Sequence, residues 1–216
     1  MRRQVHRAAR PLLQEGGLVC RRHDDARDEG AHLTSLATTP ASVATEPRIF
    51  SGSDQRQAAA ALEKELGEDA RADFSGHGFW ERARTGMFDI RICDTDAKGY
   101  GSTSSEKILA RQAKEKKDKY EAACIEQRRS FTPLVYSVDG MPCAEAKAWE
   151  KRVASKLAAK WEVRYGKMVN FVRTRMCLAI VRSNTLLLRG DRAHRWSRRG
   201  PADGIAFSAL AMGRVD

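Results

Sequence analysis

Residues 87–93 constrain the fold more than any other part of the sequence, because apolar and charged side chains alternate there. Asp89 and Arg91 lie between three apolar residues at every second position: Phe88, Ile90 and Ile92. This two-residue period is typical of a β-strand with one buried face. Residues 71–74, which include Asp73, are also β-like. We therefore expect a sheet that carries acidic side chains.

The rest of the chain shows helical and strand-like patterns in a recognisable order. Periodicity and capping residues predict helices over 18–36, 58–66, 104–128, 143–163 and 167–188, and strands over 48–50 and 131–138. That order predicts an α/β (α+β) fold with a small mixed sheet flanked by helices. We place this domain at residues 18–192, between a basic flank at 1–17 and a loose tail at 193–216, and expect both ends to be disordered.

The two aspartates are the first candidate functional residues. Three glycines separate them and favour a β-hairpin, which brings Asp73 and Asp89 to one end of the sheet; these glycines are Gly76, Gly78 and Gly86. Two neighbouring carboxylates repel each other unless a cation lies between them, so the pair is a candidate Mg²⁺ site. The alternative is that both are ordinary aspartates at strand ends on a solvated face.

The helix predicted over 104–128 supplies candidate basic residues. Lys116, Lys119, Tyr120 and Ala123 follow helical spacing and share one face. A lysine there can position an attacking water or neutralise phosphate charge, and Tyr120 can anchor it. Lys117, on the same basic stretch, and Arg91 are further candidates for nucleic-acid contacts. The alternative is an ordinary solvated basic helix face.

A third candidate feature lies on the helix predicted over 167–188 and its continuation. Arg175, Arg182 and Arg189 recur every seven residues and form one basic stripe if the helix is continuous. An apolar stripe opposite them predicts burial of that side: Val169, Val172, Met176 and Ile180. A basic stripe over an apolar face suits backbone phosphates, although it also occurs on ordinary surface helices.

The overall charge points to an anionic partner. The formal net charge is +11 and the isoelectric point about 9.7, which favours DNA, RNA or an anionic membrane surface. The five cysteines lie far apart without a C-x-x-C pair, a distribution that predicts neither a disulfide framework nor a zinc site. No apolar run approaches the roughly 20 residues that cross a bilayer. We expect a nuclear or cytoplasmic protein without a signal peptide.

Several short segments, in the same order, resemble the region downstream of the reverse transcriptase in non-LTR retrotransposons and their relatives. The resemblance covers roughly residues 15–192. The matching segments are GGLV (16–19), RHDDARD (22–28), RADF (71–74), GFW (78–80), FDIRI (88–92), KKDKY (116–120), SFTPLV (130–135) and LRGDR (188–192).

The resemblance implies a restriction-like endonuclease of the PD-(D/E)xK superfamily, which nicks target DNA to prime reverse transcription. It assigns Asp73 and Asp89 as the two metal-binding acids, with Mg²⁺ as the cofactor. It assigns Lys116 or Lys119 as the lysine on the following helix, and Tyr120 as its neighbour.

Other positions qualify this assignment. The resemblance implies an acid on the first helix, either Asp25 or Asp28. Ala72 stands where a proline usually precedes the first acid, and Arg91 stands where a lysine is usual two residues after the second. Arginine binds phosphate well but stays charged, so it is a poor proton shuttle. The zinc-knuckle cysteines expected just upstream are missing.

Three functions remain open at this point. The first is a metal-dependent DNA endonuclease that uses Asp73, Asp89 and a helix lysine. The second is a non-catalytic DNA- or RNA-binding remnant of a reverse transcriptase polyprotein, with the same basic surface. The third is an unrelated small α/β scaffold protein.

Overall fold

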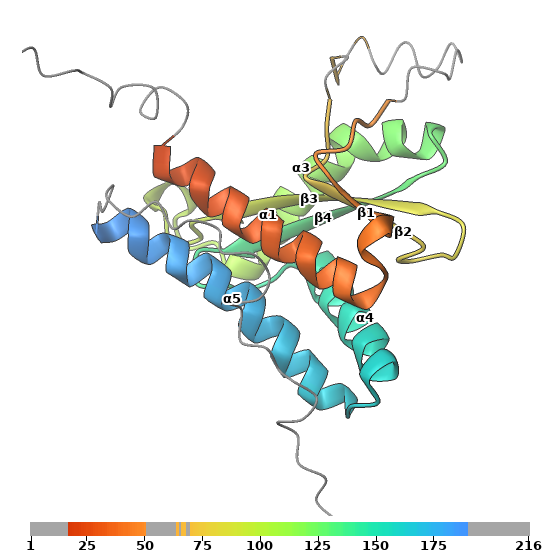
Figure 1. Cartoon of the computed structure of the whole chain (residues 1–216). Helices are drawn as coiled ribbons and strands as arrows, with labels where there is room; N and C mark the ends of the chain where they lie inside the picture. Colours follow the sequence, from red (N-terminus) through yellow and green to blue (C-terminus); the bar gives the residue numbers. More distant parts are fainter. Residues whose placement is uncertain (1–16, 51–63, 65, 68–69, 190–216) are drawn as a thin grey trace, which may run out of the picture.

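The computed structural model describes residues 17–50, 64, 66–67 and 70–189 (Figure 1). The expected tail, nearly all of the basic flank and most of the helix expected over 58–66 lie outside these residues. The elements, in chain order, are α1 (Gly17–Ala37), η2 (Pro40–Ser42), β1 (Val43–Thr45), β2 (Phe74–His77), β3 (Thr85–Cys93), η3 (Lys98–Tyr100), α3 (Ser105–Glu126), β4 (Ser130–Ser137), α4 (Ala144–Trp161) and α5 (Tyr165–Arg189).

The strands form one mixed sheet in the order β1-β2-β3-β4. β1 pairs antiparallel with β2, and β2 pairs antiparallel with β3. β3 and β4 are parallel, and α3 connects them, since parallel neighbours need a crossover. The expected α/β fold with a small mixed sheet is therefore confirmed.

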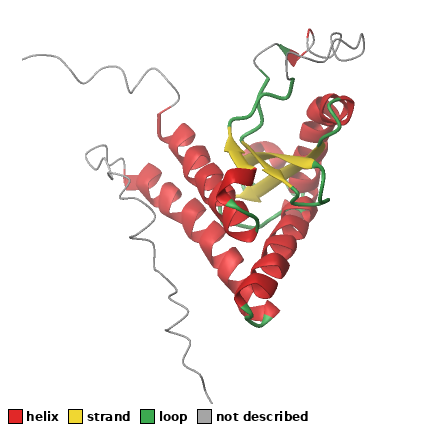
Figure 2. Cartoon of the chain, turned by 45° about the vertical axis from the view of Figure 1, so that its right-hand side comes forward, coloured by secondary structure: helices red, strands yellow, loops and turns green. Residues whose placement is uncertain are grey.

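Helices cover both faces of the sheet (Figures 1 and 2). A small cluster beneath α3 joins that helix to β3 and β4 through Met87, Phe131, Ala123 and Cys124. The larger cluster fills the space between the other face and α1 and α4, and α5 packs on the outer side of those two helices. The sheet is thus enclosed between α3 and the helix group of α1, α4 and α5.

Two glycines bring α1 close to the sheet. A Cβ atom on Gly30 would lie 3.1 Å from Cε1 of Phe74, and a Cβ on Gly76 would lie 2.9 Å from Cγ2 of Thr34. Without side chains at these positions, the middle of α1 rests directly on β2 and β3. The close approach explains a glycine inside a long helix, where it is otherwise unfavourable.

The first strand differs from the expectation. The sequence favours a strand at residues 48–50, but the strand is Val43–Thr45, and residue 48 forms only an isolated bridge with Arg71. Ile49 and Phe50 are buried in the cluster beneath α3. Their apolar character therefore reflects core packing. In the described part of the chain, no helix is long and apolar enough to cross a membrane, and all five cysteines are free.

Candidate functional site

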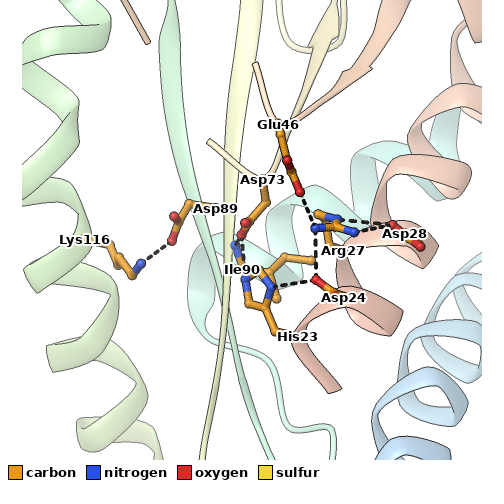
Figure 3. Close-up of polar contacts among 9 residues, drawn as sticks. All are labelled: His23, Asp24, Arg27, Asp28, Glu46, Asp73, Asp89, Ile90 and Lys116. Carbon is orange, nitrogen blue, oxygen red and sulfur yellow. Dashed lines mark hydrogen bonds and ion pairs between the residues drawn. The ribbon is translucent and has the colours of Figure 1, made fainter. Parts of the chain in front are cut away.

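The two candidate carboxylates lie where β2 begins. The antiparallel register pairs Phe74 with Phe88, and the N–H of Asp73 donates to the carbonyl of Phe88 at 3.0 Å. The paired register ends there, so Asp73 directly precedes β2, and its charge acts on the nearby Asp89 carboxyl. Figure 3 shows both side chains in the space between α1 and α3. The hairpin thus brings together the two acids that the sequence singled out.

Lys116 on α3 meets Asp89. The Asp89 side chain is 9% exposed, and its Oδ2 lies 2.8 Å from Nζ of Lys116. Lys116 reaches this position because α3 packs over the face of β3 from which Asp89 projects, next to the buried Met87. Of the lysines expected on this helix face, Lys116 is the one that joins the acids.

Asp73 is held by a strand amide and by a histidine from α1. Its Oδ2 accepts the backbone N–H of Ile90 and hydrogen-bonds to Nε2 of His23 at 3.1 Å. His23 also lies 3.8 Å from Oδ1 of Asp24, on the same helix. These contacts fix the Asp73 carboxylate at the edge of β3 (Figure 3).

Burial and neighbouring charges shift the pKa values of two residues in the site. Burial raises the pKa of the Asp89 carboxyl, Lys116 opposes that rise, and the charge of Asp73 adds to it. The hydrogen bond to Asp73 raises the pKa of His23 above its ordinary value, against the opposing effect of burial. The acids, Lys116 and His23 therefore interact electrostatically in a poorly solvated place.

A pocket opens beside the carboxylates. Its volume is about 260 Å³, and its walls come from α1, β3 and α3. Four of the six lining residues are basic or imidazole side chains; the lining consists of Arg22, His23, Ile90, Arg91, Ile92 and Lys116. The acids do not line this pocket themselves, but they contact His23, Ile90 and Lys116, which do.

The site offers carboxylate oxygens, which are ligands of hard cations such as Mg²⁺. Among the described residues, no group of three or more His, Cys, Asp or Glu side chains is arranged to hold a metal ion, as a structural or catalytic zinc site requires. Mg²⁺ keeps several waters and binds through one or two carboxylates together with substrate phosphates. Asp73 and Asp89 offer those carboxylates.

Lys119 and Tyr120 lie farther along α3 and make different contacts. The ammonium of Lys119 is 4.9 Å from the centre of the Tyr120 ring, and that of Lys116 is 5.6 Å from it. The Tyr120 ring packs against Phe131, with centroids 5.6 Å apart. Tyr120 thus anchors the helix to β4 and touches the site through Lys116.

Arg91 and Lys117 each have an acidic partner. Arg91 lines the pocket, and its Nη1 donates to Glu115 at 3.1 Å. Lys117 binds Glu145 of α4 at 2.6 Å; this hydrogen bond raises the pKa of Lys117 and lowers the pKa of Glu145. Arg91 therefore belongs to the site, whereas Lys117 ties α3 to α4.

The arginines of α5 are not equivalent. Arg175 makes a double contact with Glu29 of α1, at 2.7 and 3.0 Å, so its charge stabilises the contact between these helices. Arg182 is exposed. The helix continues to Arg189, whose side chain lies outside the described residues. Of the three arginines expected to contact phosphates, Arg182 is therefore the one whose side chain is both described and exposed.

The first helix contributes a histidine in place of the expected acid. Asp25 accepts a hydrogen bond from Ser183 of α5 at 2.6 Å, and Asp28 accepts one from Arg27. His23 is the α1 residue that reaches Asp73. The sequence signal was the RHDDARD segment itself, in which His23 stands two residues before Asp25.

No known protein-family model matches the sequence, and no curated protein matches it either.

Proposed function

We propose that this chain is a retroelement-derived nucleic-acid-binding domain, ancestrally a Mg²⁺-dependent DNA endonuclease that nicks target DNA for reverse transcription. The observation that carries the proposal is the cluster of Asp73, Asp89 and Lys116 beside a basic pocket. The resemblance of short sequence segments to retrotransposon endonuclease regions supports the same function.

The order of elements supports this proposal as well. A helix is followed by the acid-bearing hairpin, a basic helix and a further strand, as expected from the sequence. Asp73 directly precedes β2, Asp89 is on β3, and Lys116 is on the next helix. Lys116 contacts Asp89, and Asp73 lies next to this pair, where His23 contacts it (Figure 3).

Each residue has a role in such a reaction. Asp73 and Asp89 would hold Mg²⁺, which lowers the pKa of a bound water and stabilises charge on the attacked phosphate. Lys116 presents its ammonium where charge develops on the phosphate oxygens. His23 and the Ile90 amide keep the Asp73 carboxylate in one orientation.

Nicking of supercoiled plasmid DNA tests the proposal. We expect Asp73→Asn and Asp89→Asn to abolish Mg²⁺-dependent nicking and to leave DNA affinity nearly unchanged, because the carboxylates act on the metal and repel phosphate without it. Lys116→Met should lower the nicking rate by about 100-fold or more. Asp118→Asn, at an exposed position of α3, removes the same charge outside the site and should nick like the wild type.

A binding domain without catalysis is the second candidate. The basic pocket and the net charge of +11 support DNA or RNA binding independently of any reaction. The two functions separate clearly: a wild-type chain that binds DNA, but neither nicks it nor binds Mg²⁺ more tightly than Asp73→Asn, is a binding domain.

A further inference from the structure

The pocket beside the carboxylates contains one cation without an acidic partner. Lys116 pairs with Asp89, Arg91 with Glu115, and His23 with Asp73. Arg22 instead donates its Nη1 to the amide oxygen of Asn184 on α5, at 3.1 Å. No carboxylate pairs with Arg22 among the described residues, so its positive charge remains available to a ligand.

Arg22 is also held in position. Asn184 accepts from Arg22 and donates its own amide to the carbonyl of Val138, next to the end of β4. A neutral amide fixed at both ends orients the guanidinium without cancelling its charge. The remaining N–H groups of the guanidinium form a fork that matches phosphate oxygens.

The edge of β3 adds a backbone donor to the same pocket. The register with β2 ends at Phe88, so the following residues of β3 have no strand beside them on that side. The Ile90 N–H points to this edge, where Asp73 accepts it. Alternate residues of a strand direct their backbone groups to the same side, so the N–H of Ile92, which lines the pocket, faces this edge as well.

We propose that this pocket binds a DNA backbone phosphate adjacent to the one at Asp73 and Asp89, held by Arg22, Arg91 and the Ile92 amide. β3 rises by about 6.6 Å between Asp89 and Arg91, a separation on the scale of neighbouring nucleotides in one strand. Ile90 and Ile92 give the pocket an apolar side suited to a deoxyribose. The proposal rests on the proposed function, because it names how the same site holds its substrate.

The decisive variant is Asn184→Asp, which places a carboxylate of nearly the same volume against Arg22 and gives up the hydrogen bond to the Val138 carbonyl. Its matched control is Asn170→Asp, which makes the same charge change at an exposed position of the same helix. Affinity for a short DNA duplex is measured in EDTA, where nicking cannot occur, at several salt concentrations. Arg22→Gln is the second test variant, and Arg82→Gln, at an exposed position near the opposite end of β3, is its control.

We expect Asn184→Asp and Arg22→Gln to weaken binding and to reduce the slope of log affinity against log salt by about 0.9, the value of one phosphate contact. The ratio of the wild-type affinity to the variant affinity should then fall about 3.5-fold between roughly 50 and 200 mM salt. Both controls should retain the wild-type slope. Test variants that behave like their controls would overturn the proposal.

A parallel titration with inorganic phosphate identifies the source of the phosphate. The NMR signal of the Ile92 amide should shift with DNA at concentrations where inorganic phosphate has little effect. If inorganic phosphate saturates this shift while DNA leaves it unchanged, the pocket is a free-anion site and the proposal is wrong. DNA binding and nicking that are insensitive to Asn184→Asp refute this inference alone. If Asn184→Asp and Arg22→Gln lower the salt slope but the wild type does not nick DNA, only the catalytic part of the proposed function is refuted.

Discussion

Asp89 places a carboxylate where ionisation is unfavourable. Burial raises its pKa, and the charge of Asp73, just before the neighbouring strand, raises it further. Lys116 is the counter-ion that compensates, at 2.8 Å. A buried ion pair of this kind contributes little net stability, whereas the loss of one partner leaves an uncompensated charge. We therefore expect the intact pair to add little to the stability of the fold.

Removing Lys116 should consequently destabilise the chain strongly. We expect Lys116→Met to lower the free energy of unfolding by about 3 kcal/mol, because Asp89 is left buried without a counter-ion. Asp89→Asn should cost less, since the long Lys116 side chain can turn its ammonium to solvent. Urea denaturation measures both, with Lys114→Met at an exposed position of α3 as the control. Equal effects of Lys116→Met and Lys114→Met would contradict the prediction.

Glu150 is a second buried acid, outside the site. Its Oε1 accepts the hydroxyl of Tyr136 at 3.2 Å, and its Oε2 lies 3.5 Å from Nε of Arg173. Burial raises the pKa of Glu150, and both neighbours oppose that rise. The folded chain therefore binds this proton more readily than the unfolded chain does.

This shift predicts a specific pH dependence of stability. The contribution of Glu150 to the free energy of unfolding should fall as the pH rises from about 4.5, the ordinary value for glutamate, through the folded-state pKa. Glu150→Gln removes the titrating group, so its stability relative to the wild type should increase across that window. Thermal unfolding at a series of pH values measures the difference. A constant difference would refute the prediction.

At the scale of the elements, the position of α1 depends on close contact with the sheet. Gly30 allows the helix to rest on Phe74 and on Ile90, whose Cδ1 would lie 3.3 Å from an added Cβ. The same contact brings His23, two turns earlier, to Asp73. The spacing between α1 and the hairpin therefore determines the geometry of the site.

A larger residue at Gly30 should push α1 away from the sheet. We expect Gly30→Val to lower the free energy of unfolding by about 1–3 kcal/mol through overpacking. Gly166→Ala in α5 is the comparison, because a Cβ there meets nothing within 4 Å, and it should stabilise the chain by about 0.5 kcal/mol. Chemical denaturation measures both changes. A Gly30→Val variant as stable as the wild type would show that α1 is not held this closely.

The sequence predicted the long elements because their patterns are local. The alternation around Asp89 located β3, and the spacing of Lys116 and Tyr120 on one face of α3 matched their contacts with the sheet. It did not predict β1 or the role of His23. β1 exists because it pairs with β2, and His23 is in the site because α1 docks on the hairpin. Both depend on contacts between distant residues, which no local pattern encodes.

At the scale of the whole molecule, not all of the basic side chains in the described part of the chain are available to a partner. Several cations stabilise the fold instead. Arg175 binds Glu29, Arg152 donates to the carbonyls of Phe79 and Trp80, and Lys160 donates to the carbonyl of Leu36. Arg22 in the pocket differs from these cations, because it is held in position without an acidic partner among the described residues and its charge is available to a ligand.

The extension of β3 beyond β2 has a consequence for solubility. An uncovered strand edge is a template on which another chain can add a strand, and proteins commonly block such edges with charged side chains. Here the Asp73 carboxylate accepts the hydrogen bond of the Ile90 N–H. Arg91 adds a charged side chain two residues after Asp89. The carboxylate that we assign to metal binding thus also closes the sheet against self-association. An aspartate at position 73 is useful to this chain even if it only binds DNA.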